Sequence, residues 1–174
     1  MTEERKQAFA PVVNAQTRVL VCGSLPGEAS LAAGRYYAHP TNQFWRLVGG
    51  VIGRDLVGLD YSARLEALLA AGIGLWDTVG SATRSGSLDS AIRAVAPTPL
   101  ADLARTLPAL RLIAFNGTTA ARLGRVQAKK LGGLSFIQLP SSSAAYCAVS
   151  VATKQQAWNR IGEALDDFHQ PMGD

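Results

Sequence analysis

Short apolar runs alternate with segments of helical periodicity along most of the chain. Four runs are typical of buried strands, because each is almost uninterrupted and ends in a glycine, proline or polar turn. They are residues 17–23 (TRVLVCG), 73–77 (IGLWD), 111–115 (RLIAF) and 134–139 (LSFIQL). Continuous apolar strands are typical of parallel sheets with helices on both faces. The pattern therefore predicts a three-layer α/β/α fold with a central four-stranded parallel sheet.

Apolar residues at helical spacing predict the helices that cover this sheet. The stripes are Phe44, Val48, Val51 and Ile52, then Leu65, Leu68 and Leu69, and finally Val151, Trp158, Ile161, Leu165 and Phe168. Thr41, Ser62 and Ser150 precede the three stripes and are the expected starts, and Gly72 is expected to end the second helix. A further helix is expected near Thr98 and Pro99.

Polar turns follow all four predicted strands. GSLPG follows the first, Trp76 and Asp77 close the second, Asn116 and Gly117 follow the third, and LPSSSAAY closes the fourth. Ligands of open α/β sheets bind outside the carboxyl ends of the strands, so we expect the four turns to meet at one site. Any single turn also has a plain explanation, because such turns commonly need Gly, Ser and Asn.

The composition is that of a mildly basic globular protein. The 174 residues are 48% hydrophobic and 17% charged, which suits one core, so residues 1–174 are expected to form a single domain. The formal charge of +4 favours an anionic partner such as nucleic acid, although many soluble enzymes are as basic.

The cysteine pattern and the lack of long apolar runs exclude several classes of protein. Cys22 and Cys147 are the only cysteines, too few for a disulfide framework or an iron–sulfur cluster, and no C-x-x-C spacing exists for zinc. We therefore expect free thiols, no cofactor and no metal. Without an apolar signal core or a run of membrane-spanning length, the protein is expected to be cytoplasmic, with no membrane partner.

Residues 36–45, YYAHPTNQFW, place five aromatic or imidazole rings around the amide of Asn42, in a chain with only 7% aromatic residues. Core packing is one explanation. A pocket that holds a flat ring while the amide reaches its edge is the other.

Two segments resemble motifs of the uracil-DNA glycosylase superfamily. Residues 23–45, GSLPGEASLAAGRYYAHPTNQFW, are similar to the first motif block of its mismatch-specific branch and of the related hypoxanthine-DNA glycosylases. Residues 139–146, LPSSSAAY, resemble the Pro-Ser loop that forms the second motif. The similarity extends from residue 17 to residue 165. It implies a DNA glycosylase that acts in base excision repair.

Two departures from the superfamily pattern bear on the substrate. Leu25 stands where the usual catalytic Asn or Asp would be, and Leu139 stands where a His or Asn opens the second motif. Both argue against uracil chemistry of the usual kind. The hypoxanthine branch shows the same loss and places its key asparagine at the position of Asn42. The resemblance therefore implies hypoxanthine, present in DNA as deoxyinosine, as the excised base. A uracil or G·T/U mismatch glycosylase, a hydrolase of free nucleosides and a non-catalytic DNA-binding relative are the alternatives.

The resemblance makes Asn42 the expected catalytic residue. In N-glycosidic hydrolysis the base largely departs before water arrives, so an amide that positions water without deprotonating it can suffice. The alternative for Asn42 is a helix N-terminal residue that binds its own backbone. No lysine lies in the motifs where a Schiff base would form, so we expect a monofunctional hydrolase.

A base flipped out of the duplex must recover its lost stacking. Tyr37 matches the position that stacks on the base in the mismatch-specific branch, and Tyr36 is expected to line the pocket wall. Phe44 and Trp45 are expected to pack in the core and support the pocket. The amide of Asn116 is expected to read the base edge, with a turn asparagine as the alternative. The remaining substrate-binding positions of the first motif are Ser24, Leu25, Pro26 and Gly27.

The expected partner is double-stranded DNA containing a damaged base, bound by a monomer, with single-stranded DNA as a second partner. The DNA-binding candidates are Ser141, Ser142 and Ser143 for phosphates, Ala144 and Tyr146 as the wedge, and His39, which either contacts phosphate or caps its turn. Residues 117–133 carry Arg122, Arg125, Lys129 and Lys130 and no acid, typical of a phosphate-tracking edge or of a solvated helix face. Asp77 and residues 84–90, RSGSLDS, also resemble family positions, but the sequence assigns them no chemistry. Asp89 is expected either as a first-turn helix acid or as a catalytic one.

Overall fold

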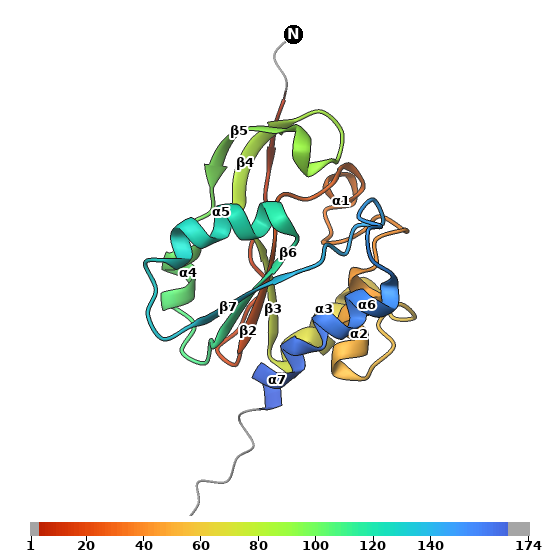
Figure 1. Ribbon diagram of the computed structural model, residues 1–174, viewed down its shortest axis with the longest axis vertical. Helices are drawn as coiled ribbons and strands as arrows, with labels where there is room; N and C mark the ends of the chain where they lie inside the picture. The colour runs from red at the N-terminus through yellow and green to blue at the C-terminus, as the bar shows by residue number, and fades with distance from the viewer. Residues whose placement is uncertain (1–3, 167–174) are drawn as a thin grey trace, which may run out of the picture.

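The central feature of the computed structural model, which describes residues 4–166, is a four-stranded sheet in the order β3-β2-β6-β7 (Figure 1). All three strand pairings are parallel. The strands are β2 (Val19–Gly23), β3 (Ile73–Asp77), β6 (Leu112–Asn116) and β7 (Ser135–Leu139). The predicted central sheet is confirmed, with strand ends within two residues of the expected ones.

Helices cover both faces of the sheet. On one face lie α2 (Phe44–Ile52), α3 (Tyr61–Ala71), α6 (Val151–Trp158) and α7 (Arg160–Asp166), and on the other lie α4 (Leu100–Arg105) and α5 (Thr118–Ala128) (Figure 1). Val19 and Val21 of β2 pack into the first layer, whereas Leu20 and Cys22 pack into the second. Because alternate residues point to opposite faces and both faces are buried, the strand reads as one continuous apolar run.

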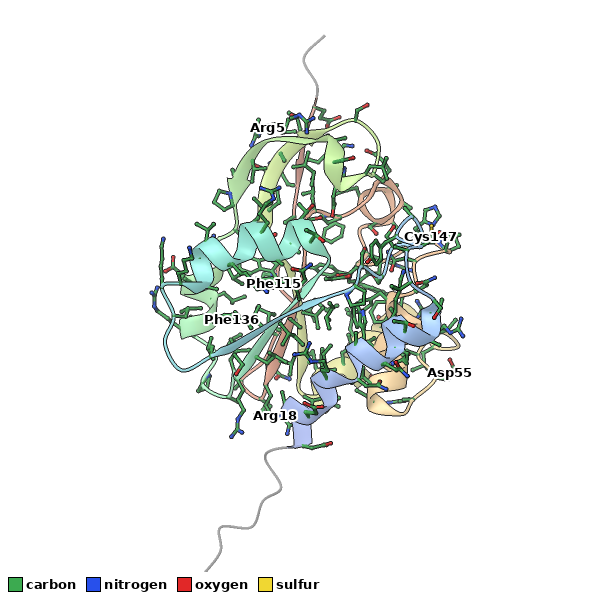
Figure 2. All side chains as sticks on the ribbon, in the orientation of Figure 1. Arg5, Arg18, Asp55, Phe115, Phe136 and Cys147 are labelled. Carbon is green, nitrogen blue, oxygen red and sulfur yellow. The ribbon has the colours of Figure 1, made fainter. Side chains whose placement is uncertain are left out.

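The second layer lies very close to the sheet. Gly124 of α5 sits directly on the ring of Phe115, which Figure 2 labels near the centre of the molecule. A Cβ on Gly124 would collide with this ring, so only glycine allows the helix this approach.

The predicted start of α3 needs correction, whereas that of α6 is confirmed. Asp60, and not Ser62, caps α3, since its side chain accepts a hydrogen bond from Ala63 N at 2.8 Å. Ser150 caps α6 as expected, accepting from Thr153 N at 3.1 Å.

The single C-terminal helix expected from the sequence is two helices, α6 and α7, which are separated at Asn159. Phe168, the last residue of its predicted stripe, lies outside the described residues. Gly72 ends α3 with a φ of 87°, which confirms its predicted place.

A second, antiparallel sheet was not predicted. Its order is β1-β4-β5, with β1 (Arg5–Gln7), β4 (Val79–Arg84) and β5 (Ile92–Pro97). A short helix, α1 (Glu28–Ala33), and a 3₁₀ turn, η1 (Asp89–Ala91), accompany it. Because β4 begins two residues after β3 ends, this sheet lies at the carboxyl end of the central one and brings the connection 85–89 to that edge. Within residues 4–166 no helix has the length and apolar character needed to span a membrane.

Candidate active site

A cavity of about 290 Å³ lies where β2, β3 and β6 end. Its walls include the last residues of these strands, Gly23, Asp77 and Asn116, together with the loop 141–145 that follows β7. The four predicted turns therefore meet at one site. Every candidate of the first motif lines this cavity, and so do His39, Asn116, Ser141, Ser142, Ser143 and Ala144.

The turn after β2 is fixed by a buried guanidinium. Arg84 of β4 is 3% exposed and donates to the carbonyls of Leu25 (3.3 Å), Pro26 and Gly86 (2.8 Å from Nε). Three carbonyl acceptors match the planar fork of an arginine, which lysine cannot reproduce. Residues 84–90 resemble family positions, but no role for Arg84 was predictable, because its partners are backbone atoms.

Leu25 lines the cavity and at the same time belongs to a small apolar cluster with Val79, Ala82 and Ile92 of the second sheet. At 6% exposure it is a packing residue of the turn. Its hydrocarbon side chain offers no hydrogen bond to a water or a base, as expected from the sequence.

Tyr37 lies at the centre of the aromatic segment. Its ring stacks on Phe44 with centroids 3.8 Å apart and an interplanar angle of 11°. Trp45 Nε1 donates to the Tyr37 carbonyl at 3.1 Å and so holds this residue at its positive φ of 53°. Phe44 and Trp45 are 0% and 4% exposed, which agrees with their expected place in the scaffold.

Tyr36 contributes to the cavity wall but is itself anchored in the core. It is 4% exposed, its hydroxyl donates to Ala10 O at 3.0 Å, and Phe9 packs edge-on against its ring. Its polar atom is therefore already paired within the protein.

Asn42 faces the cavity from the turn before α2. Its Oδ1 accepts a hydrogen bond from Phe44 N at 2.9 Å, so the expected alternative, an asparagine that binds its own backbone, is present. The prediction that Thr41 caps this helix is wrong, because its hydroxyl lies 2.8 Å from His39 Nδ1 and does not bind the start of α2. His39 is thus tied into its own turn, although its exposed ring remains at the cavity mouth.

Asn116 holds the loop after β7. Its Oδ1 accepts from Ser142 N and its Nδ2 donates to Ser142 Oγ, both at 2.9 Å. A longer contact of 3.3 Å joins Nδ2 to the Tyr37 hydroxyl. Both ends of this amide are therefore engaged by the protein.

A buried lysine supports the same loop from α6. Lys154 is 1% exposed and donates to Gln43 Oε1 at 2.9 Å and to Ser143 O at 3.2 Å. Gln43 N in turn donates to Ser142 O at 2.9 Å. Sequence reasoning missed Lys154, although its spacing from Trp158 places it on the buried stripe of the last helix.

A second, more open hollow adjoins the first and shares residues 87–89 and part of the loop 141–145 with it. Tyr146 lines this hollow and not the first cavity. Its side chain is 40% exposed, and that of Leu88 is 60% exposed. The loop then continues to Cys147, which Figure 2 labels at the surface. The basic residues Arg122, Arg125, Lys129 and Lys130 are exposed and line neither hollow.

Three carboxyl residues line the cavity: Glu28, which is paired with Lys6, and the more buried Asp77 and Asp89. Ser24 Oγ donates to Asp89 Oδ1 at 2.6 Å, and burial raises the pKa of Asp89 against the opposing effects of this bond and of Arg84. Asp77 is 3% exposed, and burial, followed by repulsion from Asp89, raises its pKa to about 7. The sequence singled out both acids without giving them a role.

Gly23 makes room for the deeper of these acids. A Cβ at this position would lie 2.8 Å from Asp77 Oδ1 and 3.1 Å from the Tyr37 hydroxyl. A side chain would therefore push both groups away from the end of β2.

Known proteins share this sequence and fold. Residues 10–162 match the uracil DNA glycosylase superfamily. The chain is 39% identical over 140 residues to a hypoxanthine DNA glycosylase of Methanosarcina barkeri, covering 80% of this chain and 88% of that protein. It is 40% identical over 158 residues to a hypoxanthine DNA glycosylase of Methanosarcina acetivorans, covering 90% and 97%. A solution NMR structure of a candidate uracil DNA glycosylase from Methanosarcina acetivorans superposes with a TM-score of 0.83 at 35% identity, covering 94% of this chain and 99% of that one. The protein therefore belongs to the uracil DNA glycosylase superfamily.

Proposed function

We propose that this chain excises hypoxanthine from DNA, by hydrolysis of the N-glycosidic bond of deoxyinosine. The family makes it a DNA glycosylase, a hydrolase of N-glycosyl bonds. The observation that supports the choice of base is that Leu25 and Asn42 occur together in one cavity. The first-motif position that usually supplies an amide or acid is a leucine packed into an apolar cluster, while an asparagine faces the same cavity from the next turn.

Asn42 is the proposed catalytic residue. Its Oδ1 is oriented by the backbone amide of Phe44 and, as a carbonyl oxygen, has a second lone pair that can accept a hydrogen bond from water. The water so held adds to the sugar C1′ after the bond to the base has largely broken, as the oxocarbenium-like transition state requires.

Tyr37 is the proposed stacking surface. One face of its ring is covered by Phe44, so a base entering the cavity would extend this stack from the other face. Gly23 to Gly27 would border the base and sugar. Ser141, Ser143 and His39 would contact phosphates, and Tyr146 would enter the vacated stack beside the second hollow. Ser142, a predicted phosphate contact, is only 1% exposed and has its N–H and hydroxyl bound to Asn116, so it holds the loop instead.

The natural substrate in this proposal is a duplex containing the damaged base, bound by a monomer whose residues 1–174 form one cytoplasmic glycosylase domain. Single-stranded DNA would be a second substrate. No Schiff base is invoked, so the expected product is an abasic strand that breaks only after alkali.

End-labelled duplexes with one hypoxanthine, uracil, xanthine or G·T mismatch test this proposal. After incubation with the protein and alkaline cleavage, hypoxanthine should give the fastest product formation, with no strand break before alkali. Free deoxyinosine is the control for a nucleoside hydrolase. Faster excision of uracil, or duplex binding without product, would contradict the proposal.

A further inference from the structure

Asp77 is the most buried acid of the cavity wall. It closes β3, is 3% exposed, and among residues 4–166 its Oδ2 finds no hydrogen-bond partner. An unpaired carboxylate at such a place is costly, whereas a neutral carboxyl needs only a partner for its own proton. The fold thus favours a protonated Asp77 that can still donate a hydrogen bond.

The groups around Asp77 preserve this state. Asp89, from η1, repels a second negative charge, whereas Arg84, from β4, attracts one. The guanidinium is occupied by the carbonyls of the motif turn and makes no hydrogen bond to Asp77. The remaining titratable neighbours are Cys22 of β2, Tyr36 and Tyr37, and burial raises the pKa of all three, so they remain uncharged.

We propose that Asp77, as a neutral carboxyl, donates a hydrogen bond to the base while it departs. The inference rests on the proposed function, which supplies hypoxanthine as the base. A carboxyl presents a donor beside an acceptor, and hypoxanthine presents an O6 acceptor beside an N1–H donor, so the two edges match.

The hydrogen bond matters most in the transition state. As the bond from C1′ to N9 breaks, its electron pair goes to the base and increases the charge on O6. A donor aimed at this charge stabilises the departing base, and Asp77 retains its proton throughout. Water supplies the hydroxyl that adds to C1′, and solvent supplies and receives the remaining protons.

Single-turnover excision of hypoxanthine from a duplex between pH 5.5 and 9 tests this role. The wild-type rate should fall as the pH passes about 7, because an ionised Asp77 cannot donate. Asp77→Ala should lose on the order of 10²-fold at pH 6, as expected for removal of one transition-state donor. Asp77→Asn keeps a donor beside an acceptor, so it should restore most of this loss and remove the alkaline decline. Asp55→Asn is the matched control and should keep the wild-type profile, because this carboxyl, labelled in Figure 2, is exposed and lines neither hollow.

Thermal melting without DNA supplies a second readout. Because burial raises the pKa of Asp77 above its unfolded value of 3.8, its stabilising effect is complete below that value and is lost as the pH rises through about 7. The Tm of the wild type relative to Asp77→Asn should therefore fall by several degrees between pH 4 and 7 and then level off. A constant difference would overturn the proposal.

The two proposals fail in different ways. Failure of the wild type to release hypoxanthine would refute the proposed function. An active wild type whose alkaline decline persists in Asp77→Asn, or a fully active Asp77→Ala, would refute the role of Asp77 alone.

Discussion

The side chain of Asn116 and the backbone and hydroxyl of Ser142 form a two-point clamp. The amide oxygen accepts from Ser142 N and the amide nitrogen donates to Ser142 Oγ, each at 2.9 Å. One residue ends β6 and the other lies in the loop after β7. The clamp therefore sets the position of the serine loop at the cavity.

Asn116→Ala should lower the stability of the fold measurably. It removes the two hydrogen bonds to Ser142 and the longer one to Tyr37, and it leaves a buried amide of Ser142 unpaired, which together should cost about 2–4 kcal/mol in the free energy of unfolding. Ser142→Ala removes only the bond to the hydroxyl and should cost about 1 kcal/mol. Denaturant unfolding of both variants measures these differences.

The same pair of variants separates the clamp from the base-reading role expected of Asn116. If Asn116→Ala unfolds at the wild-type denaturant concentration yet no longer excises hypoxanthine, the amide acts on the base and the clamp contributes little. A loss of stability with a partly retained rate would support the clamp.

The central sheet was predictable because each of its strands is buried on both faces and is therefore a continuous apolar run in the sequence. The small sheet was not. β1 has three residues, and β4 reads VGSATR, in which glycine, serine and threonine stand at most positions and register shifts in the pairing with β5 break the alternation of buried residues. Its pairing depends on contacts distant in sequence, such as Arg5 with Thr83, which no local pattern contains.

Site residues that belong to a sequence motif could be predicted. Site residues whose hydrogen-bond partners are backbone atoms could not. Asn42, Tyr37 and the serine loop all reach the hollows at the strand ends. Arg84 and Lys154 were missed because carbonyl oxygens, which leave no trace in a sequence, are most of their partners. The roles of Asn42 and Asn116 could not be separated either, since the same amide can cap a helix, clamp a loop or touch a base.

Tyr146→Ala should affect duplex substrates selectively. The ring is 40% exposed beside the second hollow, with Lys154 Nζ 5.4 Å from its centroid, so it is supported from the protein side and free on the other. A side chain that fills the vacated stack assists flipping and has little to do in a single strand. We expect excision of hypoxanthine to slow about 10-fold in a duplex and less than about threefold in a single strand.

Val126→Ala is the control for Tyr146→Ala. This residue is 64% exposed on α5 and lines neither hollow, so both rates should remain those of the wild type. Equal slowing on duplex and single-stranded substrates by Tyr146→Ala would argue against a wedge. The affinity for the duplex, measured at two salt concentrations, should also fall steeply as the salt concentration rises.

For Asn42, effects on stability and on chemistry can be measured separately, because its Oδ1 accepts a hydrogen bond from Phe44 N within the turn before α2. Asn42→Ala loses this hydrogen bond, at a cost of about 1 kcal/mol, whereas Asn42→Asp keeps an acceptor oxygen for it. If the amide positions water, Asp should melt with the wild type and retain measurable single-turnover excision, while Ala should lose most activity and little duplex affinity. If Nδ2 instead donates to the base, Asp should fail as badly as Ala, since a carboxylate donates nothing and repels an electron-rich leaving group. An Asn42→Ala protein that melts earlier but excises hypoxanthine at the wild-type rate would show that Asn42 only stabilises its own turn.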